Sequence, residues 1–552
     1  MDLRACVSWF LHENGILKVL FRYNAFDEYH TESKPLKKNY LYITVFFSGM
    51  TALAVELSAS RLLGNVFGSS NLVWASIIGL ILIYLTAGYW LGGKLADKFP
   101  QYRYFYRILM WGSMTVGLVP MVSRPILRLT ANAFDHYQMP ILAGAFVTVM
   151  VLFVIPVTLL GMISPFALKL TLHDATQVGK TAGRLSAIST LGAFIGTFLP
   201  VLILVPLIGT YRTFLFFSSL LMLVATIGFW VYVDVRSWLR MAWMPVVLVL
   251  LWLFGAQGTD KATENLIFEG ESSYNYIQVV ELNQFRYLRL NEGQGMHSVY
   301  HPTQLNYFGP WSQVLVAPFF NTPPRSLESV QRMAIVGLAA GTTARQAQAV
   351  YGKIEIDGFE IDPLIVDVGR TYFDMNQPEL VVFIQDGRWG LERSRGFYDI
   401  ISVDAYRPPY IPWHMTTIEF FQIVHERLAD DGVMVINIGR SPLDRTLIND
   451  LGTTIRQVFP TIFVMDVPDS YNTILFATKQ PGSWDYFLAN YSELYTTDVN
   501  PLLLEAMAMT ITFRQPTPEM TRVYIDDLAP IEWLTNKIVV DYFLSGGLED
   551  FQ

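Results

Sequence analysis

The feature that most constrains this chain is a succession of apolar runs between about Asn39 and about Gly255. Each run has roughly the 20 residues that a helix needs to cross the hydrocarbon core of a bilayer. Only 16% of all residues are charged and 52% are hydrophobic, which excludes a wholly soluble, disordered or fibrous protein. We therefore predict an α-helical polytopic membrane domain with about seven spans, near Tyr40–Leu63, Leu72–Leu95, Tyr104–Met121, Pro140–Leu168, Ala182–Ile208, Tyr211–Val233 and Trp238–Phe254.

Lysine and arginine are concentrated in alternate loops, and this bias predicts the orientation of the spans. The rich loops carry Arg4, Lys18, Arg22, Lys34, Lys37, Lys38, Lys94, Lys98, Arg103, Lys169, Lys180, Arg184, Arg236 and Arg240, and the poor ones little beyond Arg124, Arg128 and Arg212. We predict a cytoplasmic amphipathic segment over residues 1–39 and a multi-pass domain in the cell membrane over residues 40–257. Seven spans would place everything after Gly258 outside the cytoplasm.

Three features of the membrane domain invite a functional interpretation. Glu56 lies well inside a predicted span, where a charge costs about 2.5 to 3.5 kcal/mol, so we expect it to be neutral, paired or facing a wet cavity. It serves either a substrate or ion pathway or a structural hydrogen bond. The small residues Gly192, Ala193 and Gly196 predict close helix packing. The segment Gly93–Lys98 is similar to the second-loop motif of major facilitator transporters, and it could equally be a helix-end turn followed by solvated charges.

Several partner classes can be set aside. The net charge of -8 comes without any block of lysine and arginine that could track phosphates, so no nucleic-acid partner is expected. The single cysteine, Cys6, can form neither an internal disulfide nor a thiolate cluster. His414 has no metal-ligating neighbour at useful spacing, so no metal site is predicted.

After Gly258 the pattern of apolar and polar residues changes, and it predicts short strands and amphipathic helices. Alternation over Tyr276–Leu282 and Phe285–Leu290, with Asn283 at the turn, predicts a small antiparallel sheet within residues 262–330. Residues 331–495 then alternate strands with helices, which predicts α/β architecture with a Rossmann-like, methyltransferase-type parallel sheet. We expect its strands at Met333–Val336, Lys353–Glu360, Leu380–Ile384, Tyr398–Val403, Gly432–Ile438 and Thr461–Val467, followed by a C-terminal extension over residues 496–552.

Polar residues follow four of these strands, at the edge where parallel sheets bind ligands. They are the turn Gly337–Gly341, Glu360, the pair Asp386-Gly387, and Asp404. An acidic residue at the end of the second strand suits the two adjacent hydroxyls of a ribose. Each carboxylate could also simply cap a helix or turn.

The order and spacing of these segments carry a resemblance. Met333–Gln346, Gly358–Pro363, Gln385-Asp386-Gly387 and Tyr398–Asp404 resemble the core of spermidine synthases and other polyamine aminopropyltransferases, and Ala54–Leu57 and Gly161–Pro165 resemble the membrane half of fused members. The resemblance implies that Glu360 binds the ribose, Asp386 the adenine amino group, and that Asp404 is the catalytic carboxylate. It further implies glycine contacts from Gly337, Gly341 and Gly387, a co-substrate that is S-adenosylmethionine or its decarboxylated form, and a homodimer through the soluble domain.

The departures from that pattern fall in the part of the site that would hold the acceptor. Ala339 and Ala340 replace a glycine and an acid of the family's loop, Arg407 replaces a second acid, and Asn275 replaces a glutamine. If an adenosyl ligand binds, we expect Ala339 to have an ordinary negative φ, and Arg407 would repel a polyammonium ion if it points inward. Aromatic residues of the following loop could form a lid or simply pack: Tyr406, Tyr410, Trp413 and His414.

Three hypotheses follow. The first is a membrane-embedded, spermidine-synthase-like transferase with a degenerate polyamine site and a non-standard acceptor. The second is a catalytically silent structural or assembly subunit of a membrane complex. The third is a transporter-like protein with a nucleoside-sensing domain, motivated by Glu56 and Gly93–Lys98.

Overall fold

The computed structural model describes residues 35–67, 71–137, 141–172, 177–255, 263–291, 295–406, 411–441, 444–535 and 537. Nearly all of the predicted amphipathic segment 1–39, together with Arg407 and Tyr410, lies outside these residues. The chain divides into two compact units. One consists of Met1–Ala59, Ile77–Pro125 and Val149–Gly258 and is helical where described, and the other contains both β-sheets.

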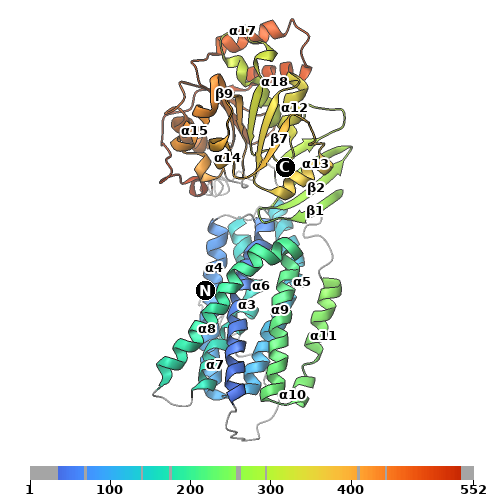
Figure 1. Cartoon of the computed structure of the whole chain (residues 1–552), viewed down its shortest axis with the longest axis vertical. Coiled ribbons are helices and arrows are strands. Elements are labelled where there is room, and N and C mark those ends of the chain that lie inside the picture. Colours follow the sequence, from blue (N-terminus) through green and yellow to red (C-terminus); the bar gives the residue numbers. More distant parts are fainter. Residues whose placement is uncertain are drawn as a thin grey trace. The chain divides into compact units, whose positions relative to one another are not determined.

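Long apolar helices make up the N-terminal half of the chain (Figure 1). They are α3 (Pro35–Phe67), α4 (Asn71–Lys98), α5 (Tyr102–Tyr137), α6 (Ile141–Gly161), α7 (Ile163–Thr171), α8 (Val178–Leu199), η2 (Pro200–Leu204), α9 (Val205–Tyr232), α10 (Val235–Leu239), α11 (Trp243–Leu250) and η3 (Leu251–Gly255).

Five helices of the described part are long and apolar enough to cross a membrane. They are Asn39–Gly64, Val73–Lys98, Tyr102–Leu127, Gly144–Thr171 and Val178–Tyr232. The prediction of seven spans is not confirmed, because its fifth and sixth spans lie within the 55-residue stretch Val178–Tyr232 and its seventh falls on the shorter apolar helix Trp243–Gly255. The long stretch is broken at Gly209, whose φ of 79° and ψ of 166° are not helical.

The predicted packing role of the small residues on α8 is confirmed. A Cβ atom added to Gly192 would overlap the carbonyl oxygen of Phe46, and one added to Gly196 would overlap that of Met50. The backbones of α3 and α8 therefore approach so closely that only glycine fits at these two positions.

The small antiparallel sheet has the strand order β1-β2-β3-β4. Its strands are β1 (Leu266–Glu271), β2 (Tyr276–Leu282), β3 (Phe285–Leu290) and β4 (Met296–Tyr300). Asn283 and Gln284 connect β2 to β3, and both have positive φ, at 51° and 68°. This is the conformation that a two-residue hairpin loop requires, so the predicted turn at Asn283 is confirmed.

The large sheet has eight strands in the order β12-β10-β11-β9-β8-β5-β6-β7. They are β5 (Arg332–Val336), β6 (Glu355–Glu360), β7 (Leu380–Ile384), β8 (Tyr398–Val403), β9 (Leu428–Gly439), β10 (Thr461–Asp466), β11 (Asn472–Thr478) and β12 (Arg514–Gln515). Strands β5 to β9 pair in parallel, whereas β10, β11 and β12 add antiparallel pairs. The predicted parallel arrangement thus holds from β5 to β9, and antiparallel strands extend one edge, where β11 returns from β10 through a short turn without a crossover helix.

Helices cover both faces of the large sheet. One face packs against η4 (Pro310–Phe320), α12 (Thr342–Tyr351), α17 (Trp484–Leu494) and α18 (Pro501–Thr512). The other packs against α14 (Gly387–Arg393), α15 (Ile418–Arg427) and α16 (Thr446–Ile455). The small sheet shares a third apolar cluster with α13 (Pro363–Tyr372), in which Ile277, Val279 and Leu288 meet Ile365 and Val368.

Candidate functional site

Four parallel strands end at one edge of the large sheet, and the predicted polar residues stand there together. Gly337 follows β5, Glu360 ends β6, Asp386 follows β7 across one residue, and Asp404 follows β8 directly. Strand β5 lies between β6 and β8. The chain runs from β5 to β6 and β7 on one side of β5, and then crosses to β8 on the other side. In sheets of this kind, ligands bind beyond the carboxyl ends of the strands at such a switch point.

Glu360 is a buried carboxylate whose two oxygens both accept backbone hydrogen bonds. Oε2 accepts from the amide of Ala339 at 2.9 Å, and Oε1 accepts from the amide of Asp362 at 3.0 Å. Burial raises the pKa of Glu360 to about 7, although the two amide bonds act in the opposite direction. A carboxylate offers about four acceptor positions, so Glu360 can close the turn and still accept hydroxyl donors from a ribose.

The glycine turn after β5 has a left-handed backbone at three positions. Gly337 and Gly341 have φ of 88° and 84°, and a Cβ atom on Gly337 would overlap the carbonyl oxygen of Asp404. Ala339 also has a positive φ, of 49°, so the expectation of an ordinary negative φ was wrong. The hydrogen bond from its amide to Glu360 offsets the steric cost of this conformation for a residue with a Cβ.

Asp386 caps the N-terminus of α14 and also contacts His414. Its Oδ1 accepts from the amide of Trp389 at 3.1 Å, and its Oδ2 lies 3.0 Å from His414 Nε2. Burial alone would raise the pKa of Asp386, but the bonds from His414 and Trp389 hold it below the ordinary value. Gly387, next in the chain, packs so tightly against Val336 that a Cβ atom would overlap it.

Asp404 is a half-buried carboxylate held by one side chain from the neighbouring strand. Asn437 Nδ2 on β9 donates to Asp404 Oδ1 at 3.0 Å. Loss of hydration raises the pKa of Asp404 to about 6, and the bond from Asn437 acts in the opposite direction. Asn437 Oδ1 is buried and has no hydrogen-bond partner in the described part of the chain. Buried polar atoms of proteins nearly always have a hydrogen-bond partner, so Asn437 Oδ1 is open to a water molecule or a ligand that donates N–H or O–H.

Sequence reasoning missed Asn437, although its signal was present. The residue lies near the end of a predicted strand, but only the observed neighbourhood of β8 and β9 brings it to Asp404. Tyr406, considered for a lid, is instead fixed by its hydroxyl, which accepts from Gly439 N at 2.6 Å and donates to Asn437 O at 3.0 Å.

Two of the departures from the family pattern have structural roles here. The side chain of Ala340 is buried in the apolar cluster with Ile277 and Ile365, so no acid occupies this part of the loop. Asn275 donates from Nδ2 to the buried carboxylate of Asp362 at 2.9 Å and thereby ties the small sheet to the end of β6. The predicted repulsion by Arg407 concerns a residue outside the described ones.

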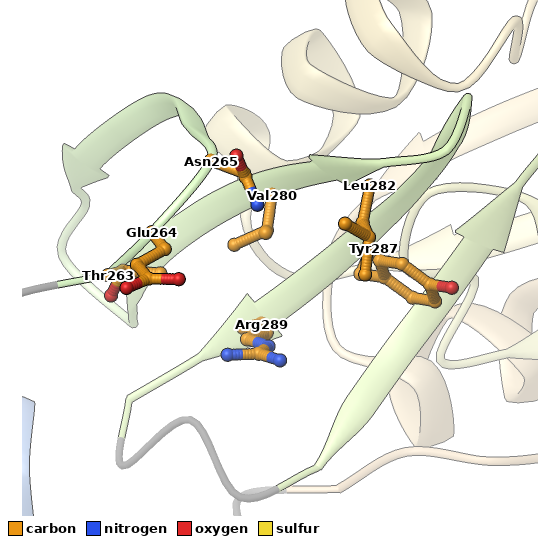
Figure 2. Close-up of a pocket in the computed structure, with 7 residues that line it drawn as sticks. All are labelled: Thr263, Glu264, Asn265, Val280, Leu282, Tyr287 and Arg289. Carbon is orange, nitrogen blue, oxygen red and sulfur yellow. The ribbon is translucent and has the colours of Figure 1, made fainter.

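A hollow of about 300 Å³ lies elsewhere, on the small sheet (Figure 2). It is lined by Thr263, Glu264, Asn265, Val280, Leu282, Tyr287 and Arg289, none of which was predicted as a site residue. Among the residues that the structure describes, no group of three or more histidine, cysteine or acidic side chains could hold a metal ion.

The match to a protein-family model falls in this α/β half, whereas two polyamine aminopropyltransferases of Ralstonia nicotianae match over 421 residues, 72% of this chain, at 24% identity. Residues 321–483 match the model of the spermine/spermidine synthase domain. A probable polyamine aminopropyl transferase of Bifidobacterium longum is 37% identical over 225 residues, which are 40% of this chain and 48% of that protein. The matched part thus spans about half the length of that relative.

Two further matches are another relative and a solved structure. A polyamine aminopropyltransferase of Vibrio vulnificus is 25% identical over 284 residues, covering 49% of this chain and 91% of that protein. The structure of spermidine synthase from Thermotoga maritima matches with a TM-score of 0.38 and 19% identity, covering 46% of this chain and 85% of that one. The chain carries a spermidine-synthase-like domain with polyamine aminopropyltransferase homologues.

Proposed function

We propose that the α/β half binds an S-adenosyl-type ligand and transfers an aminopropyl or related group from it to an acceptor amine. Glu360 would accept from the ribose hydroxyls and Asp386 from the amino group of the base, while Gly337 and Gly341 let the backbone of the turn approach the ligand. The co-substrate of the proposed reaction is S-adenosylmethionine or its decarboxylated form.

The observation that carries the proposal is the pair formed by Asp404 and Asn437. An amine must be neutral to attack, and amines of the lysine type are protonated near pH 7. Asp404, with a pKa of about 6, can accept the departing proton, and the unpartnered Asn437 Oδ1 can accept a second N–H of the same nitrogen. Both groups thus meet one nitrogen from two sides.

The acceptor arrives as an ammonium ion, and Asp404 first takes one of its protons, which frees the lone pair of the nitrogen. The lone pair of the amine attacks the carbon beside the sulfonium, the C–S bond breaks, and its electrons neutralise the sulfur. The attacking nitrogen then carries the positive charge, the product leaves as an ammonium ion, and the proton held by Asp404 passes to solvent. Asn437 orients the nitrogen, since its amide holds Asp404 on one side and accepts on the other.

The same site argues for a non-standard acceptor. A diamine brings a second, distal ammonium, which needs its own carboxylate partner. Ala340 offers a buried methyl group instead of an acid at the matched position. We propose an acceptor with a single amine and an uncharged remainder.

We also propose that the helical half spans the cell membrane seven times, with the N-terminus in the cytoplasm. The break at Gly209 separates Val178–Tyr232 into two crossing lengths. A seventh crossing is supported by contacts of the segment that follows α9: Trp243 packs on Trp111 with ring centroids 5.9 Å apart, and Gly255 O accepts from Arg124 Nη1 at 3.4 Å. The segment thus follows α5 over about 20 Å, counted at 1.5 Å per residue.

This arrangement favours a second candidate function. Seven crossings would place the α/β half outside the cytoplasm, away from an intracellular nucleoside co-substrate. The domain would then be a catalytically silent interaction module of a membrane complex. A C-terminal reporter that works only in the cytoplasm separates the candidates, because its activity would remove the support for the silent module.

Calorimetry on the full chain in detergent tests the first candidate. The ligands are S-adenosylmethionine, decarboxylated S-adenosylmethionine and methylthioadenosine. Binding of at least one is expected, and Asp404→Asn should leave nucleoside binding within about twofold because the carboxyl faces the acceptor. Folded protein that binds none of the three would contradict the proposal.

A further inference from the structure

One contact at the site is used neither by the fold nor by the transfer step. The imidazole of His414, on η6 (Trp413–Met415), lies with Nε2 3.0 Å from Asp386 Oδ2. Asp386 Oδ1 already accepts the backbone amide that caps α14. Asp386 Oδ2 is therefore the oxygen that can accept from a ligand, and the imidazole Nε2 of His414 lies beside it.

His414 is held in place through its backbone. Arg388 Nη1 donates to His414 O at 2.9 Å, and the same guanidinium makes two bonds to Asp526, at 2.7 and 2.8 Å. Thr417 Oγ1 donates to the same carboxylate at 2.7 Å. The ring is thus positioned by links between α14, the segment around η6 and the C-terminal extension, while Asp386 and His414 each keep about a third of the side chain exposed, at 34% and 29%.

An acceptor beside a donor is the pattern that pairs with a 6-aminopurine. Adenine presents an amino group that donates and, next to it, the ring nitrogen N1 that accepts. A 6-oxopurine presents the reverse, an oxygen that accepts beside an N1–H that donates. The carboxylate of Asp386 can accept a hydrogen bond from the amino group, but it cannot donate one to N1.

We propose that His414 is a specificity-determining residue that donates from Nε2 to N1 of the bound base while Asp386 accepts from its amino group. The inference rests on the proposed function, since it assigns the base-reading half of the same nucleoside site. The ring turns from Asp386 Oδ2 toward the base edge, and Arg388 keeps the backbone of η6 fixed during this small rotation.

The test compares methylthioadenosine with its 1-deaza analogue, which lacks only the N1 acceptor. Wild type should bind the 1-deaza compound about three- to tenfold more weakly, the range expected for one neutral hydrogen bond. His414→Phe keeps a ring but loses the donor, so it should bind both compounds equally, at the wild-type affinity for the analogue. His414→Gln, whose amide can donate, should restore part of the difference.

The control is His425→Phe, on α15, where the ring packs on Phe459 with centroids 5.4 Å apart. It should leave both affinities unchanged. If wild type binds methylthioadenosine and its 1-deaza analogue equally well, the proposed role of His414 is wrong, whereas the proposed nucleoside site still stands. A His414→Phe variant that binds methylthioadenosine more tightly would also overturn it, because the ring would then be a competitor of the base. Wild type that binds neither compound would remove the proposed function as well.

Discussion

At the scale of single residues, the carboxyls of Glu360 and Asp404 differ in what holds them. Glu360 is fixed by backbone amides and Asp404 by one side-chain amide. The positions of both at strand ends were predictable from the sequence, because Glu360 ends one predicted strand and Asp404 directly follows another. Their partners were not, since Ala339 reaches Glu360 only through a left-handed turn and Asn437 reaches Asp404 only through the pairing of β8 with β9.

Glu360 should make nucleoside binding depend on pH. Ribose hydroxyls donate to the ionised carboxyl, and the pKa of Glu360 in the empty site is about 7. The affinity for methylthioadenosine should therefore rise about tenfold between pH 6 and pH 8. Calorimetry at both values measures it, and Glu360→Gln should remove the difference. An equal pH dependence in the variant would mean that another group titrates.

Ala339 should be a strained position that glycine relieves. A left-handed backbone at a residue with a Cβ destabilises the folded state by about 1 to 2 kcal/mol. Replacing alanine by glycine also lowers the free energy of unfolding by about 0.4 to 1 kcal/mol, because glycine gives the unfolded chain more conformational entropy. Ala339→Gly should thus stabilise the domain slightly, by up to about 1 kcal/mol, seen as a small rise in Tm. The matched control is Ala349→Gly on the exposed face of α12, which should lower Tm. A lower Tm for Ala339→Gly would contradict the strain.

At the scale of elements, periodicity predicted the strands β5 to β10 and the helix after the glycine turn with small shifts at their ends. It did not predict β11 or β12, because a short apolar run after a turn carries no sign of its direction in the sheet. The predicted spans Ala182–Ile208 and Tyr211–Val233 divide at the break at Gly209, but the count of seven is not confirmed, because five described helices are long and apolar enough to cross a membrane.

The contact of α3 with α8 offers a test within one helix. Gly196→Ala places a methyl group against the carbonyl oxygen of Met50, so it should lower the Tm of the full chain in detergent. Gly183→Ala, on the same helix, meets nothing within 4 Å and gains helix propensity, so it should be neutral or slightly stabilising. Equal effects of the two substitutions would show that α3 and α8 are not in close contact.

At the scale of the whole molecule, the site makes stability depend on pH. Glu360 and Asp404 have folded pKa values of about 7 and about 6, above the ordinary 4.5 and 3.8. Between these pKa values the folded state binds more protons than the unfolded state. The stability that the two carboxyls contribute below their ordinary pKa values is therefore lost as pH rises through their folded pKa values. The Tm difference between wild type and Glu360→Gln/Asp404→Asn should widen in favour of the variant from pH 5 to pH 8. A constant difference would contradict the burial of the two carboxyls.

The central claim is that the crevice beyond β5, β6 and β7 binds a nucleoside, and one comparison tests it most directly. Calorimetry with methylthioadenosine is run on wild type, on Glu360→Ala, and on Glu355→Ala as a control at the opposite end of the same strand. A charge-assisted hydrogen bond contributes about 1.5 to 3 kcal/mol, so Glu360→Ala should weaken binding by about ten- to a hundredfold while Glu355→Ala does not. Equal affinity of wild type and a folded Glu360→Ala would show that this crevice is not the site.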